Sequence, residues 1–147
     1  MKILSLILFM SPAWALAGNQ VVTYEPVKVQ LSGSIESQTF PGPPNFESIN
    51  SGDSVERHYY LKLVHPVDVV PLKGGHPTVT NTDPEIEVKI VQLSIDANDD
   101  ALWAKCKKLE KGARVTILGS LFHRWTGHHH SRTLLYVESM NSPAVNN

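Results

Sequence analysis

The sequence predicts a mostly β protein: a small five-stranded OB-like barrel with one helix between strands three and four. Three observations lead to this fold class. Five segments alternate apolar and polar residues with the period of half-buried strands, and one helical segment lies between the third and the fourth of them. Two unusual connections, residues 37–54 and 123–131, fall between strands one and two and between strands four and five. In an OB barrel, these two connections flank the ligand-binding surface.

The N-terminal residues predict export. Lys2 supplies a positive charge, residues 3–10 are an unbroken apolar run, and residues 15–17 have the small-x-small pattern of a cleavage site. The apolar run is much shorter than the roughly 20 residues that a membrane-spanning helix needs. We therefore expect a signal peptide at residues 1–17, cleaved after Ala17, and a periplasmic protein without membrane insertion.

Length, charge and cysteine content exclude several classes. The 147 residues suit one domain, and their formal net charge is −1 at pH 7. A weakly acidic surface of mixed sign argues against a nucleic-acid partner, because such binding depends on neutralising phosphates. Cys106 is the single cysteine, so an intrachain disulfide is excluded. Its position between Leu102 and Leu109 favours a packed helix residue, with a reactive thiol or an intermolecular bridge as the alternatives.

Three strands are expected before the helix. A lead-in at residues 18–26 precedes the first strand, and prolines and glycines mark residues 37–54 and 65–84 as connections. The apolar phase slips near residues 91–93, which indicates a bulge in the third strand. The third strand should bury Ile86, Val88 and Ile90. The three strands are expected at residues 27–36, 55–64 and 85–94.

The helix and two further strands complete the expected domain, residues 27–140. Asp96 is the expected N-cap, and Gly112 is placed to end the helix. The buried stripe at helical spacing consists of Leu102, Cys106 and Leu109. The last two strands are expected at residues 113–122 and 132–140, followed by a loose tail at residues 141–147.

The connection between strands four and five is rich in histidine. It contains four of the seven histidines of the chain, and neutral imidazole is a common ligand of zinc and copper. The metal hypothesis names His123, His128 and His130, with His58 from the polar face of strand two as a further ligand. On an extended segment His129 should point away from His128 and His130. The alternatives are packing at the mouth of the barrel and recognition of a partner, neither of which needs a cofactor.

The connection between strands one and two combines aromatic rings with rigid prolines. Such loops present contact area at a low cost in conformational entropy, as partner-binding surfaces do. The alternative is that Phe40 and Phe46 only cover one end of the barrel. The residues predicted to bind a ligand or partner are Phe40, Pro43, Asn45, Phe46, Glu47, Trp125, Thr126, His128 and His130.

Four stretches of the chain together resemble a known family. Residues 40–49, 60–63, 112–122 and 126–130 are similar to the bacterial domain-of-unknown-function family 4431. The resemblance implies an exported, single-domain protein of Gram-negative bacteria. Many members carry two cysteines in regions where this chain has Val21-Val22 and Val69-Val70, so any family disulfide is absent here. The family implies no activity.

The sequence contains no catalytic constellation that we can identify: no Ser-His-Asp spacing, no phosphate-binding glycine loop and no close pair of carboxylates. We therefore expect a non-enzymatic periplasmic module that binds an unidentified protein or small ligand through residues 37–54 and 123–131. An inhibitor or an immunity-type protein is one version of this function. The alternative is a divalent-metal-binding protein that uses the histidine loop with zinc or copper. A hydrolase is a third hypothesis, for which no nucleophile–base pair is visible.

Overall fold

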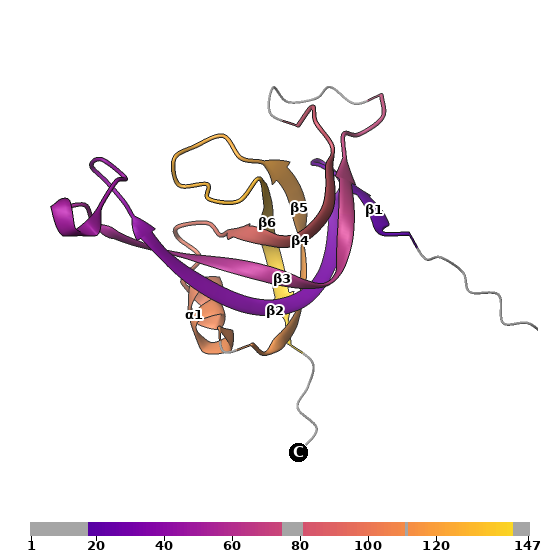
Figure 1. The fold of residues 1–147 in the computed structure, drawn as a ribbon. Helices are drawn as coiled ribbons and strands as arrows, with labels where there is room; N and C mark the ends of the chain where they lie inside the picture. Colours follow the sequence, from indigo (N-terminus) through magenta and orange to yellow (C-terminus); the bar gives the residue numbers. More distant parts are fainter. Residues whose placement is uncertain (1–17, 75–80, 111, 143–147) are drawn as a thin grey trace, which may run out of the picture.

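The structure is a computed structural model. Its strands wrap into a barrel, and one helix packs against the barrel (Figure 1). Residues 18–74, 81–110 and 112–142 are described. The expected signal peptide, residues 1–17, lies outside the described residues, and so does the expected tail from residue 143 onward. Within the described part of the chain, no helix is long and apolar enough to cross a membrane.

Five of the six strands close the barrel. Strand β2 pairs with β3, β3 with β4, β4 with β6, β6 with β5, and β5 again with β2. All of these pairs are antiparallel except β4–β6, and helix α1 lies between β4 and β5. This arrangement confirms the predicted five-stranded OB-like barrel. The elements are β1 (Gln20–Thr23), β2 (Lys28–Pro41), η1 (Ile49–Ser51), β3 (Val55–Val70), β4 (Glu85–Ser94), α1 (Asp100–Leu109), β5 (Arg114–His123) and β6 (Thr133–Asn141).

The barrel interior follows the predicted alternation of apolar residues. On β5, Val115, Ile117 and Leu121 are fully buried. Thr116 and Leu118, which alternate with them, face outward. The same pattern buries the apolar face of β2. Gly33 is needed where β2 passes from β3 to β5, because it pairs with both neighbours and a Cβ there would lie 2.2 Å from the Lys62 carbonyl oxygen.

Residues 18–26 differ from the expected lead-in. They contain β1, which pairs in parallel with the last residues of β3, so that Val22 lies opposite Val69. Tyr24 is 1% exposed and forms a β-bridge with Leu121. Its hydroxyl donates to the Asp83 carbonyl oxygen. This segment therefore contributes to the core of the barrel.

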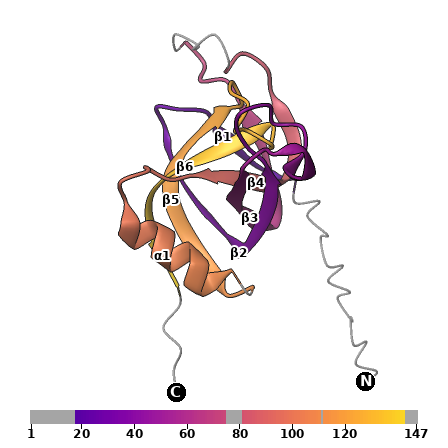
Figure 2. The same cartoon turned by 90° about the vertical axis from the view of Figure 1, so that its left-hand side faces the viewer.

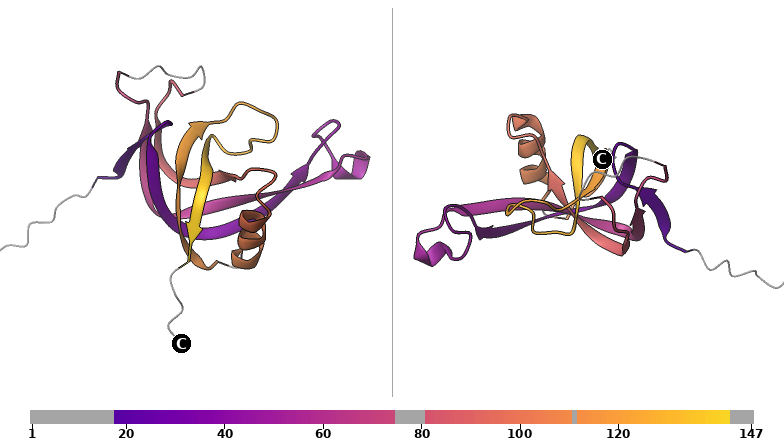
Figure 3. Two further views of the ribbon diagram at one scale, coloured as in Figure 1. Left: turned by 180° about the vertical axis from the view of Figure 1, so that it is seen from behind. Right: turned by 90° about the horizontal axis from the view of Figure 1, so that it is seen from above.

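The first two barrel strands are longer than expected. Strand β2 continues to Pro41 instead of ending at residue 36, and β3 continues to Val70 instead of ending at residue 64. Pro66 is tolerated within β3 because the β3–β4 register shifts between Lys62 and Val67. The β2–β3 hairpin consequently extends beyond the barrel body (Figures 1 and 3), and its loop is restricted to residues 42–54.

The expected bulge at residues 91–93 is not found there. The register shifts of the β3–β4 pair lie nearer the start of β4, where Glu87 has a φ of 58°. This local irregularity leaves Ile86 64% exposed, contrary to the expectation that it faces the core, and buries Glu85 instead. Residues 91–93 are buried in succession because Val91 and Leu93 belong to the core and Gln92 is covered from outside.

Helix α1 begins later than expected. Asp99, rather than Asp96, is the N-cap, and its carboxylate accepts a hydrogen bond from the Leu102 backbone N–H at 3.0 Å. The helix ends at Leu109, and Gly112 follows with a φ of 86°. Helix α1 lies against the barrel (Figure 2). The predicted stripe packs on the core, and Cys106 is fully buried.

Candidate functional site

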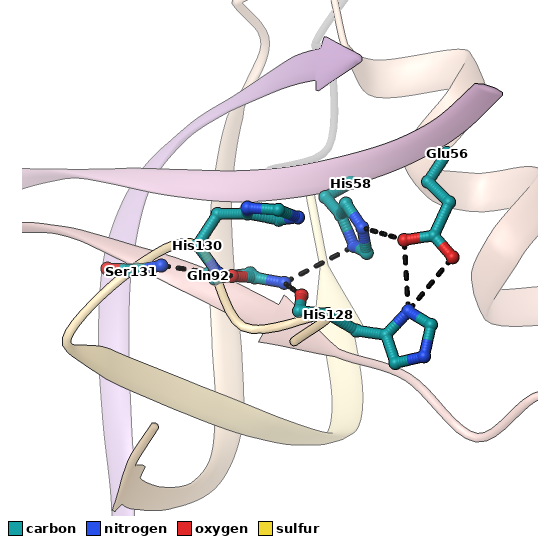
Figure 4. Close-up of polar contacts among 6 residues, drawn as sticks. All are labelled: Glu56, His58, Gln92, His128, His130 and Ser131. Carbon is teal, nitrogen blue, oxygen red and sulfur yellow. Dashed lines mark hydrogen bonds and ion pairs between the residues drawn. The ribbon is translucent and has the colours of Figure 1, made fainter. Parts of the chain in front are cut away.

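Outward-facing side chains of β3 and β4 form the floor of the candidate site. Tyr60 on β3 lies opposite Gln92 on β4, and Glu56 and His58 share the outer face of β3 with Tyr60. The loop between β5 and β6, residues 124–132, is here called the histidine loop. It lies over this floor (Figure 4). The barrel thereby brings strand residues and a distant loop into one place.

Gln92 fixes the position of the histidine loop. Its Oε1 accepts hydrogen bonds from the backbone N–H groups of His130 at 2.7 Å and Ser131 at 3.1 Å. Its Nε2 donates to the His128 carbonyl oxygen at 2.8 Å (Figure 4). Gln92 is 2% exposed, so these bonds satisfy an amide that has no access to water.

The same amide determines where His58 carries its proton. The three backbone contacts fix Gln92 Nε2 as a donor, and this atom lies 3.2 Å from His58 Nδ1. His58 Nδ1 must therefore accept, which places the ring proton on Nε2. Nε2 faces Glu56 Oε2 at 3.1 Å and donates to it.

Glu56 joins the two histidines. Its carboxylate also accepts from His128 Nδ1, at 2.9 Å from Oε1 and 3.0 Å from Oε2. Burial raises the pKa of Glu56, but the hydrogen bonds from His128 and His58 outweigh burial and hold the pKa below its ordinary value. Glu56 is therefore an anion at neutral pH.

Aromatic contacts join the β2–β3 hairpin to the histidine loop. The rings of Phe40 and His130 stack with centroids 3.7 Å apart and planes inclined by 4°. Farther along the hairpin, Phe46 meets His128 edge to face at 5.1 Å. The two connections singled out in the sequence thus form one surface, although Phe46 remains 38% exposed.

Three of the predicted residues shape the hairpin loop itself. The Asp53 carboxylate accepts from the backbone N–H of Asn45 at 2.9 Å, from its Nδ2 at 3.1 Å, and from the Glu47 N–H at 2.8 Å. Hydrogen bonds from backbone N–H groups, that of Ser48 first, lower the pKa of Asp53. The Pro43 carbonyl oxygen accepts from the Ser54 N–H. These contacts lie within the hairpin, so Pro43, Asn45 and Glu47 give the loop its shape.

The remaining loop residues lie toward solvent. Trp125 is 70% exposed, and the Thr126 carbonyl oxygen accepts from the His129 N–H at 3.2 Å. As predicted, the His129 ring points away from its neighbouring histidines and packs against Phe122 and Trp125. Among the predicted binding residues, Trp125 and Phe46 are the large apolar side chains with the highest exposed fractions.

His123 lies apart from the other predicted metal ligands. Its Nε2 is 3.0 Å from Glu85 Oε1, and Arg132 Nε is also 3.0 Å from that oxygen. Its backbone N–H donates to Asn81. The structure therefore places His123 at the end of β5 in a separate polar cluster, whereas His58, His128 and His130 are brought together.

Within the described residues, one group has the spacing of metal ligands. Ligand atoms of Glu56, His58 and His130 all lie within 4.8 Å of one another. His130 Nε2 is buried and has no hydrogen-bond partner among the described residues. Burial lowers the pKa of His130, and the nearby His58 lowers it further, so its imidazole is neutral at pH 7.

Glu56 and Gln92 are residues of the site that were not predicted from the sequence. Glu56 alternates with His58 and Tyr60 on one strand face, and this pattern could have indicated that Glu56 lies beside His58. Gln92 interrupts an apolar run, which was interpreted as a bulge.

Comparison with protein families bears on the same loop. Residues 90–141 match a family described as Domain of unknown function (DUF4431). The match confirms the predicted resemblance for residues 112–122 and 126–130, whereas residues 40–49 and 60–63 lie outside the matched part. The matched residues run from within β4 through α1 and β5 to the last residue of β6, and they include Gln92 and the whole histidine loop. Searches of curated proteins and of solved structures each found no match.

Proposed function

We propose that this protein is a non-enzymatic periplasmic binding module that recognises a protein or small ligand. Its binding surface consists of residues 37–54 and 123–131, here called the two-loop surface. The observation that carries the proposal is the direct joining of the β2–β3 hairpin to the histidine loop, through the Phe40–His130 stack and the Glu56–His128 pair. In OB barrels the corresponding connections flank the ligand site.

The two-loop surface has the properties of a partner-binding site. Phe46, Ile49 and Trp125 are 38%, 42% and 70% exposed, which leaves apolar area open to solvent. The backbone around them is held by Asp53 and Gln92, so binding would order few additional groups. Exposed aromatic residues on rigid loops are frequent energetic centres of interfaces. A projecting hairpin also suits insertion into a cleft of a toxin or cell-wall enzyme, the inhibitor or immunity version of the function.

Partner capture tests this proposal. Untagged protein coupled to a resin is exposed to a periplasmic extract of its source bacterium, and retained proteins and small molecules are identified by mass spectrometry. We expect a specific ligand to be retained by the wild type and lost with the double variant Phe46→Ala/Trp125→Ala. Leu118→Ala is the matched control, because Leu118 on β5 is 39% exposed but outside the two loops.

Two results would contradict the proposed binding surface. One is retention of the same ligand by the double variant, and the other is loss of the ligand with Leu118→Ala. Circular dichroism of each variant verifies that the barrel is intact before capture is compared.

Export has its own measurement. Strand β1 begins at Gln20, so cleavage after Ala17 would leave β1 and the barrel strands intact, with Gly18 and Asn19 before β1. Intact-mass analysis of protein from the periplasmic fraction should give a chain that begins at Gly18. A chain that still carries Met1 would contradict the proposed location.

A further inference from the structure

A carboxylate and two imidazoles converge beneath the histidine loop. The ligand atoms of Glu56, His58 and His130 lie within 4.8 Å of one another, on two different parts of the chain. Glu56 and His58 are on β3, and His130 is on the β5–β6 loop. Zinc ligands lie about 2.0–2.2 Å from the metal, so a modest approach of His130 would complete such a geometry.

We propose that Glu56, His58 and His130 form a binding site for a zinc ion. Two imidazole nitrogens and one carboxylate oxygen are a donor set that zinc uses where a fourth position is left for water or another ligand. His128 would not be a ligand; it would orient the Glu56 carboxylate through the hydrogen bond from Nδ1. This inference goes beyond the proposed partner binding and favours the alternative of a metal over the expectation of no cofactor.

His130 supplies the independent observation. Its Nε2 is buried without a hydrogen-bond partner in the described part of the chain, and a buried polar atom in this state is costly. Phe40 stacks on the ring, and Gln92 accepts from the backbone N–H of His130. The His58 ring lies 5.0 Å from it, centroid to centroid. A cation at this position would satisfy the nitrogen lone pair.

The hydrogen bonds without metal are compatible with this site. The proton on His58 Nε2 now lies between the imidazole and the Glu56 carboxylate, where the cation would lie. When zinc binds Nε2, that proton leaves and Nδ1 takes up a proton from solvent, so the ring stays neutral. Gln92 Nε2 and His58 Nδ1 are then both donors, so the His58 ring has to move out of its 3.2 Å contact with Gln92, which keeps its three hydrogen bonds to the loop backbone.

Titration with zinc tests the proposal. Untagged protein is stripped with a chelator, and zinc chloride is added in a calorimeter. We expect one zinc ion per chain, weaker binding by about 10- to 100-fold for His128→Ala, and a larger loss for Glu56→Gln and His130→Ala. His129→Ala is the matched control, because His129 is in the same loop but turns toward Phe122 and Trp125. It should bind zinc as the wild type does.

A spectroscopic measurement on the wild type does not depend on whether the variants fold. Nitrogen-15 NMR should show the His58 proton on Nε2 before zinc is added and on Nδ1 afterwards. The proposal is overturned if the wild type shows no zinc binding, if zinc leaves the His58 tautomer unchanged, or if His129→Ala abolishes binding as His130→Ala does. Because partner capture is measured separately with Phe46 and Trp125 variants, either proposal can fail without the other.

Discussion

Phe40 and His130 stack face to face, with ring centroids 3.7 Å apart. Phe40 is near the end of β2, and His130 is in the loop that precedes β6. The stack is therefore a direct link between the projecting hairpin and the histidine loop, the two parts of the proposed binding surface.

This link predicts energetic coupling between the two residues. In a double-mutant cycle, Phe40→Ala and His130→Ala should be non-additive by about 0.5–1.5 kcal/mol, the usual range for aromatic pairs. The free energy of unfolding is measured by urea denaturation of the chelator-treated protein, so that metal does not contribute. The cycle of Phe40→Ala with His129→Ala is the control and should be close to additive. Additivity in the first cycle would mean that the loops are energetically separate.

Gln92 is predicted to contribute more to the free energy of unfolding than an exposed glutamine does. Gln92→Ala leaves the carbonyl of His128 and the N–H groups of His130 and Ser131 without their partner. We expect a loss of about 1–3 kcal/mol in the free energy of unfolding. Gln30→Ala, at an exposed position of β2, should change it by less than about 0.5 kcal/mol. Equal effects of the two substitutions would contradict the role assigned to Gln92.

Asp53 predicts a loss of hairpin stability in acid. Its pKa is lowered in the folded protein by backbone hydrogen bonds, first from Ser48 and then from Asn45 and Glu47. The contribution of Asp53 to the stability of the hairpin is therefore fully present above its ordinary pKa, about 3.9. It is lost as pH falls from there through the lower folded value. Asp53→Asn should remove this part of the acid dependence and also destabilise the hairpin at pH 7.

The Asp53 prediction is measured by NMR of the hairpin amides between neutral and acid pH. The exposed Asp83 supplies a control substitution, Asp83→Asn, which should leave the acid response of the hairpin amides unchanged. If the hairpin of Asp53→Asn shows the same acid response as the wild type, the carboxylate does not hold the loop.

Cys106 is predicted to be chemically inert in the folded protein. It is fully buried on the face of α1 that packs against the barrel, and burial raises the pKa of its thiol to about 11. Labelling by a thiol reagent at pH 8 should therefore be slow until the protein is denatured. Cys106→Ser should cost about 1–3 kcal/mol, because it buries a hydroxyl in apolar surroundings. Fast labelling of the native protein would contradict the packed position.

Residue alternation predicted the barrel because each interior position is decided locally. Val115, Ile117 and Leu121 had to share one face of β5 whatever strands lay beside it. The exact ends of β2 and β3 depend on pairing with distant strands, which no local pattern contains. Pro66 favoured a strand that ends at residue 64, yet the register shift beside Pro66 lets β3 continue.

The candidate site was predictable only in part, for a related reason. His58, His128 and His130 stood out by residue type, and the OB topology brought the two connections together. Glu56 and Gln92 are ordinary polar residues in their strands, and their roles arise only because a distant loop covers them. His123 was grouped with the other histidines by proximity in sequence, but it pairs with Glu85 instead.

The Glu56–His128 contact joins residues 72 positions apart. Contacts of such long range form slowly, because chain entropy must be lost before the contact returns any free energy. A chain that emerges N-terminus first must wait until the β5–β6 loop has followed before this contact can form. The two-loop surface is consequently a late product of folding. A partner that contacts both loops at once would bind the folded barrel and would not bind partly folded chains.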